Sequence, residues 1–209
     1  MDEDELARMQ AMTDQLGAST CERRIAARKE YVDGPDEEPT LDPERLWVEG
    51  SIECCVVRTP GGWLCGYARV PDDHPWVGLN EDDPVPAPRP LDEDTLAEEA
   101  MDDFGVMPVF LAAFGGEERR AEFERSLGSQ VNVHGGVTFA GVLSWVKGAT
   151  HGWWIGFDCH HAGDAIDPAH ATGAWASLPP ILRDGHVWTV DEAALECKRM
   201  ATAIAGAGR

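Results

Sequence analysis

Histidines and carboxylates gather in one short stretch of the chain, residues 156–164, and the sequence supports chemistry best there. Asp158, His161 and Asp164 follow one another at three-residue intervals. On a helical turn that spacing keeps three side chains within an arc of about 120°, so that one cation would reach all of them. Imidazole and carboxylate ligands together favour Zn, Mn, Fe or Ni, whereas a purely oxygen set would favour Mg or Ca.

His134 is the predicted fourth member of this group. It stands at what we expect to be the end of a strand over 131–134, and the two glycines after it allow backbone and ligand to approach closely. If the two segments are neighbours, His134, Asp158, His161 and Asp164 form a site with two histidines and two carboxylates. A divalent transition metal there, Zn or Mn, would lower the pKa of a bound water and create a nucleophile near neutral pH.

Two other interpretations of these four residues stay open. Without a metal, the same side chains would work as an acid/base pair with orienting carboxylates. Histidine and aspartate in a glycine-broken loop also cap helices, brace turns and bond backbone carbonyls without any catalytic role. The spacing of the group fits all three interpretations and does not by itself choose among them.

A nucleotide-like ligand requires a stacking surface and a cation for its phosphate. Trp154 lies on the same face of a predicted strand as Asp158, so its ring would stack on a nucleobase, although packing within the sheet explains this residue as well. Lys147 and Arg183 are the two cations of the segment 131–189 and would bind phosphate. The sequence therefore predicts a ligand-binding role for Trp154, Lys147 and Arg183.

The charge balance excludes several classes of protein. The chain has 209 residues with 38 acidic and 17 basic side chains, a formal net charge of −21, which repels nucleic-acid phosphates and anionic lipid. We find no run of 18 apolar residues and no signal-peptide pattern, so we expect a cytoplasmic protein without a membrane partner. Six cysteines without a C-x-x-C pair fit a reducing compartment and predict buried thiols.

The elements that must position these residues predict an α+β fold. Strands are expected over 52–58 and 63–70, joined by a turn at Thr59-Pro60-Gly61-Gly62, and over 137–145 and 153–157. These elements indicate a mostly antiparallel sheet with packed helices.

A C-terminal helix is predicted to close this sheet. Thr189 and Glu192 form a capping box that starts the helix. Its buried face is expected to hold the apolar residues that share helical spacing, Ala194, Cys197, Ala201 and Ile204.

The distribution of charge predicts the domain boundaries. Residues 1–45 are expected to form an acidic helical extension, and residues 46–209 a single core domain. An acidic insert is expected at about 81–128, because residues 81–103 hold ten acids and one base. A homodimer is the commonest oligomer for such a chain.

Three motifs are informative in combination: Gly66-Tyr67 leading to His74-Pro75, Val133 to Phe139, and Trp154 to Asp164. Together they resemble a family of uncharacterised proteins of bacteriophages and actinobacteria, over about residues 47–205. The resemblance implies a phage or prophage accessory protein, expressed in the host cytoplasm, but it transfers no catalytic roles. The acidic extension and insert depart from the pattern of the family.

Phage accessory proteins of this size often oppose host defence. We therefore expect metal-assisted hydrolysis of a small nucleotide-like ligand in counter-defence. One alternative is a non-enzymatic sponge that sequesters a nucleotide immune signal in the same pocket. Another is an acidic decoy that inhibits a basic protein partner by presenting spaced carboxylates.

Overall fold

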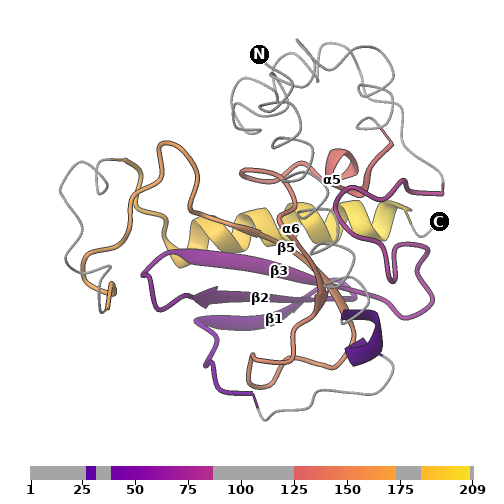
Figure 1. Cartoon of the computed structure of the whole chain (residues 1–209), viewed down its shortest axis with the longest axis horizontal. Helices are drawn as coiled ribbons and strands as arrows, with labels where there is room; N and C mark the ends of the chain where they lie inside the picture. Colours follow the sequence, from indigo (N-terminus) through magenta and orange to yellow (C-terminus); the bar gives the residue numbers. More distant parts are fainter. Residues whose placement is uncertain (1–26, 32–38, 87–124, 173–184, 208–209) are drawn as a thin grey trace, which may run out of the picture.

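A five-stranded antiparallel sheet lies at the centre of the molecule (Figure 1). The computed structural model describes residues 27–31, 39–86, 125–172 and 185–207. The strands are β1 (Arg45–Glu49), β2 (Ile52–Arg58), β3 (Leu64–Val70), β4 (Phe139–Val142) and β5 (Trp153–Asp158), in the order β1-β2-β3-β5-β4. Helix α6 (Val190–Ala207) packs on one face of the sheet, against β2 and β3. The predicted α+β fold is thus confirmed.

The predicted hairpin of β2 and β3 is present. Its turn is closed by the N–H of Thr59, which donates to the carbonyl of Trp63 at 2.9 Å, and by Gly62 at a φ of +96°, a conformation that glycine adopts without strain. Since Cys65 at the start of β3 pairs with Asp158 at the end of β5, the hairpin turn and the polar stretch after β5 lie at the same edge of the sheet.

Two clusters of buried side chains form the core, one on each face of the sheet. Alternation along β5 sends Trp153, Ile155 and Phe157 toward α6 and Trp154 to the opposite face. The predicted apolar face of α6 is confirmed, because Ala194, Cys197, Ala201 and Ile204 are all buried. The cysteines of the described residues are buried free thiols, as expected.

The predicted capping box opens α6. The N–H of Thr189 donates to Glu192 Oε2 at 2.8 Å, and the N–H of Glu192 donates to Thr189 Oγ1 at 3.3 Å. These two bonds satisfy amides that have no partner inside the helix. The cap fixes where α6 begins and therefore where its side chains meet the sheet.

The C-terminal part of α6 is held by a buried histidine. His74 Nε2 lies 3.0 Å from the carbonyl of Ile204, and His74 Nδ1 accepts the N–H of Trp76 at 3.1 Å. This pairing requires a neutral ring with its proton on Nε2, and burial lowers the pKa of His74 accordingly. Trp76 is itself buried, so the proline-rich segment around it packs on the core.

Residues 131–134 do not form the predicted strand. The segment follows the short helix α5 (Leu127–Gln130) and has no ladder partner in the described residues. Val131 and Val133 are buried in the core cluster that includes α6, so their alternation reflects packing and not sheet pairing. The strand predicted over 137–145 is likewise shorter, because the chain leaves the sheet after Val142.

The predicted acidic extension and insert fall largely outside the described residues. Residues 27–31 are helical. Further along, Leu41 donates its N–H to the carbonyl of Trp145 and Glu44 donates to Val56, both at 2.9 Å, so the segment that leads into β1 is bonded to the core. None of the helices described here is long and apolar enough to cross a membrane.

Candidate metal centre

His134, His161 and Asp164 come together beyond the end of β5. One ligand atom from each side chain lies within 4.8 Å of the others. His134 Nε2 is 2.8 Å from Asp164 Oδ2, and His161 Nδ1 is 3.6 Å from the same oxygen. Ligands about 2.1 Å from a tetrahedral zinc ion stand about 3.4 Å apart. These three side chains therefore form a group that could hold a metal ion.

Asp164 is the centre of this group. Its side chain is only 4% exposed. Oδ1 accepts the indole N–H of Trp188 at 2.8 Å, and Oδ2 accepts the backbone N–H of His161 at 2.7 Å. Oδ2 also lies 2.8 Å from Nε2 of His134. Burial alone would raise the pKa of Asp164, but the hydrogen bonds from His134, His161 and Trp188 outweigh it and hold the pKa well below its ordinary value. The carboxylate is thus ionised at neutral pH.

His161 offers a buried nitrogen to the group. Among the described residues, its Nδ1 has no hydrogen-bond partner, although it lies 3.6 Å from Asp164 Oδ2 and 3.9 Å from Asp158 Oδ1. The Asp164 carboxylate raises the pKa of His161 more than burial lowers it. A buried polar atom without a partner is costly, and a cation between the carboxylates would supply the missing interaction.

Two glycines shape the backbone beside His161, as the sequence suggested. Gly135 has a φ of +67° and Gly136 a φ of +81°, which disfavours residues with a side chain. A Cβ atom on Gly135 would overlap the His161 ring. Gly135 therefore allows the His134 turn to approach His161, and the two imidazole rings lie edge to face with centroids 5.2 Å apart.

Asp158, the fourth predicted residue, lies at the rim and not within the group of three. Its side chain is 30% exposed. Oδ2 accepts the hydroxyl of Thr138 at 2.8 Å, and Oδ1 accepts the N–H of His160 at 3.1 Å. These bonds fix the carboxylate beside His161 while leaving part of it open to solvent.

Two residues that the sequence did not single out hold His134 in place. The ring of Trp188 packs on His134 with centroids 4.4 Å apart. Glu196 Oε2 accepts the backbone N–H of His134 at 3.1 Å, and Arg199 Nη1 lies 3.2 Å from Glu196 Oε1. Glu196 is an acid on the otherwise apolar buried face of α6, and this break in the helical pattern was the signal for it.

The predicted ligand-binding residues do not join the group. Trp154 is fully buried in the core cluster on the face opposite α6, so in this structure its ring offers no face to a ligand. Lys147 lies in the connection before β5, at the far end of that strand from Asp158, and its ammonium bonds both oxygens of Asp42. Arg183 lies outside the described residues.

No protein-family model, curated protein or solved structure matches this chain. The fold and the site therefore define it, as an α+β protein with a His/Asp group that could hold a metal ion.

Proposed function

We propose that this protein binds one divalent transition-metal ion, Zn or Mn, through His134, His161 and Asp164 and hydrolyses a small nucleotide-like ligand there. The buried Nδ1 of His161, which has no hydrogen-bond partner in the described residues, is the observation that carries the proposal. Three protein ligands with an open position are the usual donor set of hydrolytic zinc sites. The bound ion would supply a water of lowered pKa.

Asp164 and Asp158 would have different roles in this reaction. Asp164 orients the ring of His134 through the contact at 2.8 Å and fixes the backbone of His161 through the bond at 2.7 Å. Asp158 would accept the proton of the attacking water, because its carboxylate is partly exposed, lies beside His161 and is held by Thr138. A general base has to lie within hydrogen-bond reach of the proton that it takes, and the rim of the group is the place for it.

An aromatic pair at the same edge supports a flat ligand. The rings of Trp63 and His160 stack with centroids 4.3 Å apart and an interplanar angle of 14°. His160 is exposed and directly precedes the ligand His161, so this pair of rings belongs to the loop that carries two of the proposed metal ligands. Nucleobases stack on such rings whatever the charge of the protein.

Phosphate on such a ligand would need a positive charge in a chain with a net charge of −21. Arg58 is mostly buried and already paired with Glu44 and Asp167. A metal ion would therefore be the main electrophile at this edge. Removal of a nucleotide signal in this way agrees with the counter-defence role that the resemblance to phage accessory proteins implies.

Metal content and phosphoester hydrolysis of His161→Ala test the proposal. His170→Ala is the matched control, because His170 also pairs with an aspartate three residues away, at 2.7 Å from Asp167, yet lies outside the group of three. We expect about one equivalent of metal in the wild type and in His170→Ala and none in His161→Ala. Hydrolysis of nitrophenyl phosphate esters and nucleotides should stop with chelator.

Metal retained by His161→Ala, or no metal taken up by the wild type from excess Zn²⁺ or Mn²⁺, would reject the site. Stoichiometric metal and nucleotide binding without turnover would favour the sponge over the hydrolase.

Glu196 gives a prediction about the support of His134. Glu196→Ala should weaken Zn²⁺ binding by about 10- to 100-fold, because the His134 turn loses the acceptor for its backbone N–H. Glu196→Gln should lose much less, since an amide oxygen still accepts that bond. Titration calorimetry with Zn²⁺ measures both variants. Equal losses in the two variants would show that the charge of Glu196, and not its hydrogen bond to His134, supports the site.

A further inference from the structure

Strand β1 forms one edge of the sheet (Figure 1). It pairs with β2 on one side, and no strand in the described part of the chain pairs with it on the other. Alternate residues of such a strand direct their backbone N–H and C=O groups outward, so the edge can accept one more strand. Natural proteins block such edges with proline, a bulge or charged residues. In β1 the charged residues are at the two ends, Arg45 and Glu49, and its pairing with β2 has no bulge.

The middle of β1 leaves an apolar side chain in solvent. Val48 is 65% exposed, more than any other large apolar residue that the structure describes. Leu46 lies on the same face of β1 by alternation and packs on the core cluster opposite α6. Side chains that face each other across two antiparallel strands have Cβ atoms about 4.5–5.5 Å apart. An apolar residue opposite Leu46 on a further strand would therefore extend that cluster across the edge.

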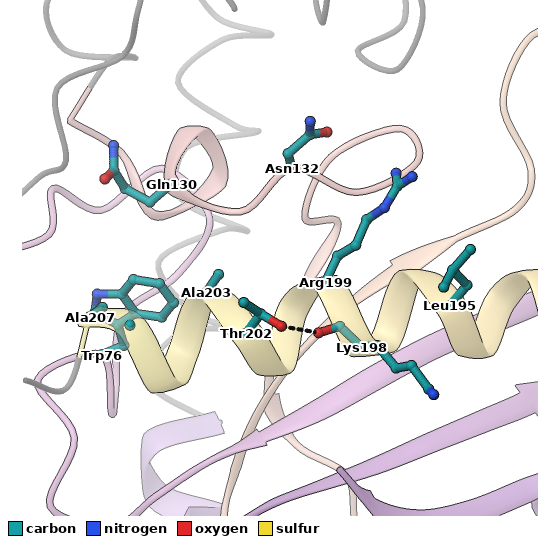
Figure 2. Close-up of a pocket in the computed structure, with 10 residues that line it drawn as sticks. Trp76, Gln130, Asn132, Leu195, Lys198, Arg199, Thr202, Ala203 and Ala207 are labelled. Atoms are coloured by element: carbon teal, nitrogen blue, oxygen red, sulfur yellow. Dashed lines mark hydrogen bonds between the residues drawn. The ribbon is translucent and has the colours of Figure 1, made fainter. Parts of the chain in front are cut away.

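The charged ends of β1 lie on the face that carries α6. Arg45 is 3.1 Å from Asp191, and Glu49 is 3.5 Å from Lys198, and both partners belong to α6. Figure 2 shows Lys198 extending from α6 on the side of the strands. The side chain of Arg45 is 45% exposed and that of Glu49 is 37% exposed. Both therefore retain surface for an ion pair with a neighbouring strand.

We propose that β1 pairs with β1 of a second copy of this chain, antiparallel and about a two-fold axis at Trp47. Arg45 of each copy then lies opposite Glu49 of the other, and Leu46 lies opposite Val48. The order of residues in β1 is thus complementary to itself, because each charge meets its opposite and each aliphatic side chain meets another. A register shifted by two residues would place Arg45 opposite Trp47 and lose both ion pairs.

This pairing gives a closed dimer with one continuous sheet. Pairing of β1 with β4, the other edge strand, would instead build an open chain of molecules, because the two edges differ. The net charge of −21 on each copy opposes association at long range. At about 0.15 M salt, charges more than about 8 Å apart are largely screened, so association is measured at that ionic strength. The dimer uses none of the proposed metal ligands and is independent of the hydrolase.

Analytical ultracentrifugation with chelator, from low to high micromolar concentrations of the protein, tests the proposal. The wild type should show a monomer–dimer equilibrium. Val48→Lys should weaken dimerisation at least about tenfold, because it places a charge opposite Leu46 of the other copy. Leu195→Lys is the matched control. Leu195 is also well exposed, at 54%, but lies on the side of α6 away from the strands (Figure 2), so this variant should dimerise like the wild type.

Exchange of the charges tests the register. Arg45→Glu and Glu49→Arg each place like charges opposite one another, so each variant alone should be monomeric where the wild type dimerises. A mixture of the two variants should form a heterodimer, and the double variant Arg45→Glu/Glu49→Arg should dimerise again. Damage to the fold of either variant would not be repaired by mixing. A monomeric wild type, growth into larger species, a dimer that survives Val48→Lys, or a mixture that stays monomeric would overturn the proposal.

Discussion

Replacing Asp164 with asparagine will destabilise the metal-free protein by about 3 kcal/mol near pH 5.5. The carboxylate is nearly fully buried and accepts bonds from the His161 backbone and from Trp188 while facing His134. An asparagine has one acceptor oxygen in place of two, and its NH₂ group would oppose one of these donors. The variant should also lose metal binding, since Asp164 is the one carboxylate in the group of three.

The stability lost in Asp164→Asn will decrease both at lower and at higher pH. The folded pKa of Asp164 is held below its ordinary value of 3.8. The stability that this carboxylate contributes is therefore complete above pH 3.8 and disappears as the pH falls from 3.8 toward the folded pKa. The folded pKa of His161 is raised above 6.5, so its contribution is complete below 6.5 and disappears as the pH rises through the folded pKa. The difference between the two proteins should therefore be largest between about pH 4 and 6.5.

Urea unfolding with chelator, across pH 3 to 8, measures this difference. Asp158→Asn is the control, because Asp158 is partly exposed and accepts from Thr138 and His160 at the rim; its loss should be about 1 kcal/mol. A pH-independent loss in Asp164→Asn, or equal losses in the two variants, would contradict the assignment of Asp164 as the ionised centre of the site.

Local chemistry made the hairpin and α6 predictable. In the Thr-Pro-Gly-Gly turn, proline restricts φ and glycine allows a positive φ, so the turn forms from its own residues. The capping box at Thr189 and Glu192 satisfies helix amides within four residues. The proximity of His161 and Asp164 followed from their short spacing in the same way. Each of these features is decided by neighbours in the chain and requires no knowledge of the tertiary structure.

Contacts between distant segments were not predictable. An alternation of valines before His134 fits a strand, but the segment is buried by packing on the core and has no ladder partner in the described residues. Trp154 shares a strand face with Asp158, yet the residues that cover it come from the connection after β4, including Leu143 and Val146. Glu196 meets His134 across 62 residues of sequence. Periodicity predicts which face of a strand or helix is buried, but it does not predict which residues cover that face.

Gly135→Ala adds only one methyl group, but we expect it to disrupt the metal site strongly. The new methyl group would occupy the position of the His161 ring, so either the ring or the His134 turn must move. We expect Zn²⁺ binding to weaken by about 100-fold and the stability to fall by about 3 kcal/mol, from the strained positive φ and from overpacking together.

Gly50→Ala separates these two causes. Gly50 has a φ of +63°, close to the +67° of Gly135, but a Cβ atom there meets nothing within 4 Å. It should therefore lose about 1 kcal/mol from backbone strain alone and bind Zn²⁺ like the wild type. Metal titration and urea unfolding of the pair measure both effects. If the two variants lose the same stability and keep the same affinity, the ring of His161 is free to move, and the close approach to Gly135 does not hold the site together.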